Sequence, residues 1–327
     1  RRRGIGQTIS DDGPDSHRPK AGTPTMGGLA MLAGILGSAL VTSWAARGSG
    51  AGADDVFGRA HAIGAHDLLA VLLLMVAFGI LGMVDDYLTV RPTGTARGIS
   101  SKPKALLQIL LAIGFAAWAA YGRPAEFSPI LFVAGSPLLA GPLYWVFSVV
   151  FIVGMANFVN ITDGLDGLVS GLAAIACVAF VGVIALVPPH EGFGQVSLMA
   201  LLMGMAGACA AFLWFNANPA KVFMGDTGSL ALGVGLPAVA ILTHREALMI
   251  VVGMVFVLDG LSTAVQWAVF KYTRIRTGTG RRVFKKSPIH HHFEMSGWPE
   301  QTVVVRFWII GAVFAVFGLA GAAWRWW

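Results

Sequence analysis

Nine long apolar segments constrain this chain more strongly than any other feature of its sequence. A helix needs about 20 mostly apolar residues to cross a bilayer, and only 12% of the 327 residues are charged, about half the share in a soluble domain. Because lipid offers no hydrogen-bond partner to a free backbone group, segments this apolar should be helical. The sequence predicts an all-α polytopic membrane protein, a single domain over residues 1–327, with nine transmembrane helices near 26–46, 66–84, 104–121, 142–159, 167–187, 196–216, 228–243, 246–271 and 303–324.

The segment 228–243 differs from the other eight because it is short and contains Gly233, Gly235 and Pro237. Small residues let neighbouring membrane helices approach each other closely. We therefore expect this helix to be bent or tightly packed.

The distribution of basic residues predicts which helix ends face the cytoplasm, because loops rich in Lys and Arg stay on that side. One set of connecting segments carries only five of the 23 basic residues: Arg47, Arg59, Arg123, Arg245 and Arg325. The other set is therefore expected to be cytoplasmic. The formal net charge of +6 then favours anionic lipid and phosphate-bearing ligands. Nucleic acid is the weaker alternative, because the charges are dispersed around a membrane domain.

The chemically unusual residues all lie in the segments predicted to be cytoplasmic. Five stretches that are far apart in the sequence contain them: KAGTPTMGG (20–28), MVDDY (83–87), NFVNITDGLDGL (157–168), FNANPAKVFMGDTGS (215–229) and SPIHHHFE (287–294). Such convergence is what a single site built from several helix ends would produce.

Asp85 and Asp86 end the second predicted helix. A helix C-terminus carries partial negative charge, so carboxylates there are disfavoured by a few tenths to about 1 kcal/mol each. Adjacent helical residues point about 100° apart, so one ligand would not meet both in the same way. The alternative is that they are solvated acids that mark the helix end. The costly placement, and further acids at the same predicted depth, favour a functional interpretation.

Four polar residues, Asn157, Asn160, Asp163 and Asp166, recur at intervals of three. That spacing places side chains on one face of a helix. Each aspartate alone is better explained as a residue in the first turn of the next helix, and each amide as a contact between helices. Together the four form more polar surface than capping requires.

Asp226 lies in the motif GDTGS directly before a predicted span. It could cap that helix with Thr227 and Ser229. It could equally belong to a phosphate site, because a helix N-terminus favours phosphate and Mg²⁺ takes one or two carboxylates together with phosphate oxygens. The motif alone supports both equally. Nearby Phe223 could be a core residue, the usual role of a lone Phe, or a flat surface for a base.

Three consecutive histidines, His290, His291 and His292, follow Pro288 in a basic loop. Adjacent residues cannot all chelate one ion in regular geometry, and a transition-metal site would need ligands at other spacings. We therefore favour hydrogen bonds to phosphate or sugar over a metal site.

In this order, the motifs resemble the phospho-N-acetylmuramoyl-pentapeptide transferases, also called translocase I. The residues that carry the resemblance are GTPTMGG, the Asp85–Asp86 pair, NxxNxxDGLDGL, FMGDTGS and SPIHHHFE. It runs from GQTISDDGP near the start of the chain to RFWII near its end. Polyprenyl-phosphate N-acetylhexosamine-1-phosphate transferases in general share the aspartate motifs, whereas HHHFE is similar to the muramoyl branch in particular.

The resemblance implies a ten-helix fold with both termini periplasmic, which the nine spans fit if a first helix precedes Arg1. It also implies a homodimer in the bacterial inner (cytoplasmic) membrane, with the active site facing the cytoplasm. The implied reaction moves phospho-MurNAc-pentapeptide from UDP-MurNAc-pentapeptide to undecaprenyl phosphate. It releases UMP, forms lipid I and requires Mg²⁺.

Roles for single residues follow from the same resemblance. Asp226 is expected to hold Mg²⁺ and to be catalytic together with Asp85 and Asp86, and Asp85 would act on the lipid phosphate as a base or as an orienting group. The residues expected to bind the uridine end are Asn160, Asp163, Asp166, Asn216 and Phe223, with Phe223 stacked on uracil. Those expected to bind phosphate and sugar are Lys20, His290, His291 and His292. Asn157 is also expected to bind substrate.

Asp259 departs from the resemblance, which leads us to expect Glu at this mid-span position. An acid inside the membrane is a functional candidate by default, and we favour a structural role between helices because the family's chemistry lies elsewhere. The segment 47–65 is also longer than the resemblance leads us to expect.

Two other functions stay open on the sequence alone. One is a sister transferase that uses UDP-N-acetylglucosamine. The other is a transporter with the aspartates as an ion relay. Transporter sites tend to lie near the midplane on broken helices, whereas these acids fall at helix ends, and only Asp259 and the 228–243 span support transport.

Overall fold

The computed structural model describes residues 22–48, 56–90, 98–121, 130–133, 136–187 and 195–324. Among these residues, nine helices are long and apolar enough to cross a membrane, which confirms the predicted helical membrane fold. They are α1 (Gly28–Gly48), α2 (Val56–Val90), α3 (Ser101–Tyr121), α4 (Pro142–Thr162), α5 (Leu168–Leu186), α6 (Gln195–Asn216), α7 (Gly225–Thr243), α9 (Met254–Thr277) and α11 (Glu300–Ala323).

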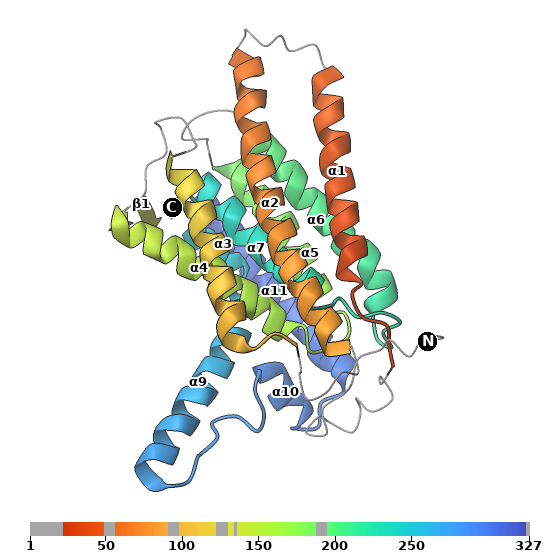
Figure 1. Ribbon diagram of the computed structural model, residues 1–327, viewed down its shortest axis with the longest axis vertical. Helices are drawn as coiled ribbons and strands as arrows, with labels where there is room; N and C mark the ends of the chain where they lie inside the picture. The colour runs from red at the N-terminus through yellow and green to blue at the C-terminus, as the bar shows by residue number, and fades with distance from the viewer. Residues whose placement is uncertain are drawn as a thin grey trace.

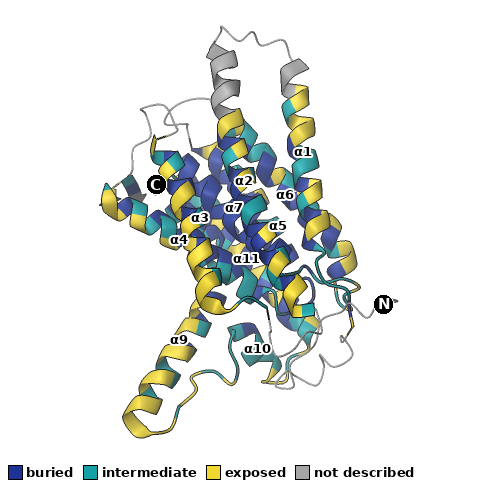
Figure 2. Cartoon of the chain, viewed as in Figure 1, coloured by how far each residue is buried: buried dark blue, intermediate teal, exposed yellow. Residues whose placement is uncertain are grey.

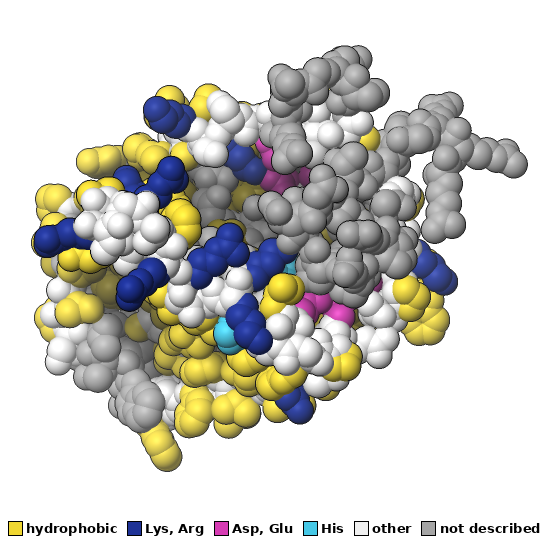
Figure 3. All heavy atoms as spheres, turned by 90° about the horizontal axis from the view of Figure 1, so that it is seen from below, with side chains coloured by type: hydrophobic (Ala, Val, Ile, Leu, Met, Phe, Trp, Pro, Cys, Tyr) yellow, Lys and Arg dark blue, Asp and Glu magenta, His cyan; other side chains and the backbone are white. Residues whose placement is uncertain are grey.

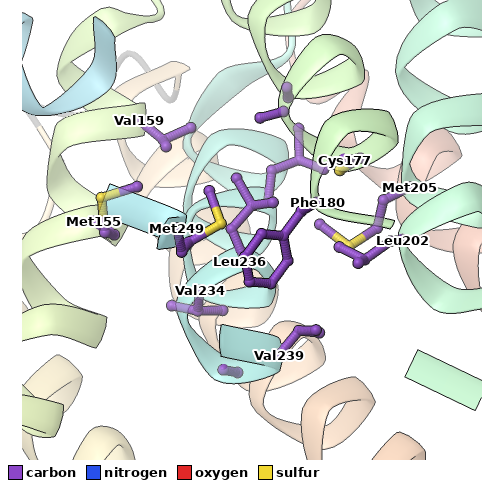
Figure 4. Close-up of a cluster of buried hydrophobic side chains, with 14 of the residues drawn as sticks. Met155, Val159, Cys177, Phe180, Leu202, Met205, Val234, Leu236, Val239 and Met249 are labelled. Atoms are coloured by element: carbon purple, nitrogen blue, oxygen red, sulfur yellow. The ribbon is translucent and has the colours of Figure 1, made fainter. Parts of the chain in front are cut away.

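Helix α7 forms the centre of the bundle, with α2 and α4 as its most extensive neighbours. Every residue from Thr227 to Thr243 is buried (Figure 2). Close approach explains the glycines, because a Cβ atom at Gly233 would lie 2.7 Å from Cα of Ala156 on α4. Val234 and Leu236 of α7 pack among apolar side chains from the surrounding helices (Figure 4). The expectation of tight packing for this short helix is thereby confirmed.

The outer helices present apolar side chains on the outside of the bundle. Leu40 on α1, Val150 on α4 and Val316 on α11 are each more than half exposed, and exposed residues run along the outer helix faces in Figure 2. An exposed apolar surface of this extent requires lipid rather than water around it. The chain is a multi-pass membrane protein.

Two features differ from the sequence prediction. The single span expected over 246–271 is divided at Gly253 into a short helix α8 (Glu246–Val252) and α9, which continues to Thr277 and projects away from the bundle (Figure 1). In addition, an antiparallel hairpin of β1 (Ile130–Val133) and β2 (Ser136–Ala140) connects α3 to α4. Neither changes the bundle, because each lies at one of its ends.

The chain returns from α9 to the bundle through a segment that ends in the short helix α10 (Ile289–Glu294). Gln266 holds this segment, because its side-chain oxygen accepts hydrogen bonds from the backbone N–H groups of Val283 and Phe284. Helix α10 lies at the same end of the bundle as the last turn of α2 (Figure 1).

Candidate active site

The site begins with a carboxylate that caps the central helix from a neighbouring helix. Asp86, at the end of α2, is buried and accepts hydrogen bonds from the backbone N–H groups of Asp226 (2.9 Å) and Thr227 (3.0 Å) and from the Thr227 hydroxyl (2.7 Å). Gly82 permits this approach, since a Cβ atom there would lie 2.2 Å from the carbonyl oxygen of Asp226. Asp86 thus fixes the start of α7, and Asp226 with it.

Asp226 lies at the centre of a polar cluster built from four helices. Its Oδ1 accepts a hydrogen bond from Asn160 on α4 (2.8 Å), and its Oδ2 pairs with the ammonium group of Lys104 on α3. The same ammonium lies 3.2 Å from Oδ2 of Asp85 on α2, whose Oδ1 accepts the backbone N–H of Ile99. The carboxylates of Asp85 and Asp226, which are 141 residues apart in the sequence, therefore share one cation.

The end of α4 adds a further acid beside this cluster. Burial raises the pKa of the Asp163 carboxyl to about 8, and nearby carboxylates, chiefly that of Asp226, act in the same direction. Part of the residue stays accessible, and its carboxyl group has no hydrogen-bond partner among the described residues. The raised pKa favours the protonated form of Asp163, in which the carboxyl group can donate a hydrogen bond to a ligand.

Two of the three histidines approach this same turn from α10. A Cβ atom at Gly164 would lie 2.5 Å from Nε2 of His290 and 3.3 Å from Nε2 of His291. His291 Nδ1 is 2.6 Å from the carboxylate of Glu294. Burial lowers the pKa of the His291 imidazole, and Glu294 acts against this shift. His292 differs, because its Nδ1 accepts the backbone N–H of Lys285 and its ring packs on Phe284.

A basic surface surrounds this end of the molecule. Figure 3 views it from below, and Lys and Arg side chains are spread over the described part of that face, with few acidic side chains visible. Such a surface attracts anionic ligands.

Comparison with known proteins decides the family. Residues 68–244 match the family described as glycosyl transferase family 4, and residues 20–32 match the phospho-N-acetylmuramoyl-pentapeptide-transferase signature 1. The phospho-N-acetylmuramoyl-pentapeptide-transferase of Ruegeria pomeroyi is 41% identical over 98% of this chain and 85% of its own length. Proteins of the same name from Pelotomaculum thermopropionicum and Shouchella clausii are each 40% identical over 98% of this chain and 90% of their own lengths.

The chain belongs to the phospho-N-acetylmuramoyl-pentapeptide transferase family. The resemblance noted from the ordered motifs is confirmed, and with it the enzyme class, a phosphoglycosyl transferase. The transporter interpretation has no support from these relatives.

Within this transferase, some of the predicted residues meet and others do not. Asp85, Asp226 and Asn160 meet in the polar cluster, with Asp163 next to them. Asn157 turns instead to α3, where its amide donates to Gln108 (2.8 Å). Lys20 lies outside the described residues.

The predicted residues Asp166 and Asn216 engage the protein itself. Oδ2 of Asp166 accepts hydrogen bonds from Asn218 and from the backbone N–H of Ala220. The Asn216 side chain bonds to the backbone of Gly167 and Val222. Both residues are buried. They hold the 216–222 segment against the start of α5, and substrate binding by either stays a prediction.

Phe223 is held by the segment that precedes α1. Its backbone N–H donates to the carbonyl of Pro24, and its carbonyl accepts the N–H of Gly27. The residue is only partly buried, and stacking of its ring on a base stays a prediction.

Lys104 is the transferase residue that the sequence motifs missed. A signal was present, because the first turn of a helix disfavours a cation, and Lys104 lies in the first turn of α3. The same reasoning had drawn attention to Asp85.

The carboxylates of Asp85 and Asp226 fit Mg²⁺. They already bracket one cation, the Lys104 ammonium, and Mg²⁺ in proteins usually binds one or two carboxylates together with substrate phosphate. Among the described residues, no group of three or more His, Cys, Asp and Glu side chains is placed to hold a metal ion. The donor set therefore fits an ion whose coordination a phosphate-bearing substrate completes.

Proposed function

We propose that this enzyme transfers phospho-MurNAc-pentapeptide from UDP-MurNAc-pentapeptide to undecaprenyl phosphate, yielding lipid I and UMP for peptidoglycan synthesis. The reaction takes place at the cytoplasmic face of a bacterial inner membrane. The observation that carries the proposal is the cluster of Asp85, Lys104 and Asp226, which lies where three membrane helices begin or end. A site at that depth serves one water-soluble and one lipid substrate.

The reaction exchanges one phosphoanhydride for another, so it is nearly balanced in energy and needs no ATP. Its main obstacle is the repulsion between two anionic phosphates. Lys104 supplies fixed positive charge beside Asp226, and the N-terminus of α7 adds its partial positive charge. Asp226 and Asp85 would hold Mg²⁺, which would further neutralise the charge that develops on phosphate oxygens.

The remaining residues divide between the two substrates. Asp85 acts on the phosphate of undecaprenyl phosphate as a base or an orienting group, and Asp86 keeps Asp226 in place. Asn160 and Asp163 bind the uridine end, with Phe223 stacked on uracil. Lys20 and the histidines of α10 bind phosphate and sugar.

Helix α9 provides a surface for the lipid substrate. Its exposed last turns carry Lys271, Arg274 and Arg276, and the Lys271 ammonium lies 4.8 Å from the ring centroid of Trp267. Cations beside an interfacial aromatic residue suit the boundary between lipid and water. We propose that these residues guide the lipid phosphate, and that two copies form a homodimer in the bilayer.

The test uses purified protein, undecaprenyl phosphate and radiolabelled donor. Label should move from UDP-MurNAc-pentapeptide into lipid, with equimolar UMP, only when Mg²⁺ is present. Transfer from UDP-N-acetylglucosamine instead would identify the sister transferase. Vesicle uptake of the nucleotide without release of UMP would refute transferase function altogether.

A further inference from the structure

A fully buried acid and a fully buried histidine form a pair between α9 and α10. Nδ1 of His290 lies 2.7 Å from Oδ2 of Asp259, and Oδ1 of Asp259 accepts the backbone N–H of His290 at 3.2 Å. Both side chains are 0% exposed. The cluster around Asp226 does not account for this acid, which lies within the apolar part of α9.

The pair fixes which nitrogen of His290 faces the site. Because the carboxylate accepts hydrogen bonds only, the proton of a neutral imidazole belongs on Nδ1. Nε2 then points away from Asp259, toward the 163–166 turn, where a Cβ atom at Gly164 would lie 2.5 Å from it. Nε2 is buried and has no hydrogen-bond partner within the described part of the chain.

An unpaired buried polar atom destabilises the folded protein, and such groups recur where a ligand supplies the missing partner. Nε2 of His291 faces the same turn, and Glu294 holds its ring from behind as Asp259 holds that of His290. Two neighbouring imidazoles, each held by a carboxylate, thus present the same nitrogen to one place.

We propose that Asp259 is a positioning residue for the transfer reaction. It orients His290 so that Nε2 hydrogen-bonds to the sugar diphosphate part of the donor. The inference rests on the proposed function, and it replaces the interpretation of Asp259 as a purely structural contact between helices.

The two oxygens of Asp259 explain why a carboxylate stands there. One accepts the backbone N–H of His290 and the other faces its ring. Asparagine has a single oxygen, so Asp259→Asn leaves one of the two donors facing an NH₂ group. Glutamate keeps both acceptors, and Asp259→Glu is therefore the conservative variant.

Ser262 offers a matched control one turn further along α9. Its hydroxyl accepts the backbone N–H of Ile289 at 2.9 Å and so also joins α9 to α10, and it donates to the backbone carbonyl of Asp259 rather than to the His290 ring. Ser262→Ala tests what the loss of a structural link alone does.

The experiment compares Asp259→Asn, Asp259→Glu, His290→Gln, the Asp259→Asn/His290→Gln double variant and Ser262→Ala in the labelled-transfer assay. Loss of residues that orient ligand histidines in metal sites lowers function roughly tenfold to hundredfold, and a similar fall in kcat/KM for UDP-MurNAc-pentapeptide is expected for Asp259→Asn. KM for undecaprenyl phosphate should not change. Asp259→Glu should restore most of the activity, Ser262→Ala should stay within about twofold of the parent, and the double variant should be no worse than His290→Gln.

Full activity of folded Asp259→Asn, an equal loss in Ser262→Ala, or losses that add in the double variant would each overturn the proposal.

Nitrogen NMR of histidine-labelled wild-type enzyme covers the case in which Asp259→Asn does not fold. The His290 signal, assigned by its loss in His290→Gln, should show protonated Nδ1 and should shift at Nε2 when UDP-MurNAc-pentapeptide is added. An unchanged Nε2 signal with bound donor contradicts the inference. Wild-type enzyme that transfers no label refutes the proposed function instead, and the protonation of Nδ1 then tests the Asp259–His290 pair alone.

Discussion

The two ends of helix α7 both carry charged groups, yet they are built differently. At the N-terminal end, Lys104 and Asp226 keep 17% and 25% of their side-chain surface exposed. At the C-terminal end, Arg245 and Glu246 are almost fully buried, at 2% and 1%. There Arg245 donates hydrogen bonds to the carbonyls of Thr243 and Val187, and the Tyr144 hydroxyl lies 2.5 Å from the Glu246 carboxylate.

The sign of the charge does not distinguish these ends. A carboxylate such as that of Asp226 stabilises a helix N-terminus, and a guanidinium such as that of Arg245 stabilises a helix C-terminus. Both ends of α7 therefore carry a charge that stabilises the helix. The difference lies in access and in crowding of like charges. Buried charges at the C-terminal end bond to the protein itself, whereas carboxylates at the N-terminal end gather around one lysine and remain open to a ligand. That contrast separates a structural polar cluster from a candidate active site.

The largest effect is expected from Asp226→Asn. An amide is a poor ligand for Mg²⁺, and loss of one group that stabilises transition-state charge typically costs a hundredfold or more. Transfer of labelled sugar phosphate should therefore fall by at least about a hundredfold, with an unfolding temperature close to that of the parent. Near-normal turnover over a range of Mg²⁺ concentrations would remove Asp226 from the metal role.

A smaller effect at the same end is expected from Phe223→Ala. Stacking of a base on an aromatic ring contributes about 1–3 kcal/mol in nucleic-acid complexes, so UMP affinity should fall about tenfold or more. Calorimetric titration of UMP measures this directly, and the KM for undecaprenyl phosphate serves as the internal control. Unchanged UMP affinity would show that the ring has only a packing role.

At the opposite end, Tyr144→Phe should affect stability rather than chemistry. It removes the hydroxyl beside the buried Glu246 carboxylate, and an unsatisfied buried group costs about 1–3 kcal/mol. The unfolding temperature in detergent should fall while kcat per folded molecule stays within about twofold. A Tyr144→Phe variant that is stable but inactive would contradict the proposal that the C-terminal end of α7 has only a structural role.

A pH-dependent effect on stability is expected at Asp163. Its pKa of about 8 lies above the ordinary value of 3.8, so the unfolded chain releases this proton at lower pH than the folded protein does. Stability is therefore lost as pH rises from about 4 to about 8 and is constant above that. Asp163→Asn removes the loss, so its unfolding temperature without nucleotide or Mg²⁺ should exceed that of the parent by an amount that grows up to pH 8. Parallel curves would contradict the raised pKa.

Particular residues show how far the sequence could predict this structure. Long apolar runs located the nine spans of the described part of the chain, although not the division of one of them at Gly253, and Gly233 with Gly235 indicated the tightly packed helix. The motif around Asp226 led to the central cluster. The spacing of three between Asn157 and Asn160 could not predict that one faces α3 and the other α7, because helix rotation depends on packing with both neighbours. A single lysine such as Lys104 has no motif of its own, and its role emerges only when α2, α3 and α7 meet.

The central claim is that the N-terminal end of α7 binds the divalent cation together with the donor's phosphates. Mn²⁺ shares the oxygen-ligand preference of Mg²⁺, so its binding to the purified enzyme in the presence of UDP-MurNAc-pentapeptide can be followed by electron paramagnetic resonance. We expect nucleotide-dependent Mn²⁺ binding in the parent enzyme and in Glu246→Gln, and its loss in Asp226→Asn. Undiminished binding in folded Asp226→Asn, or its loss in folded Glu246→Gln, would contradict the account.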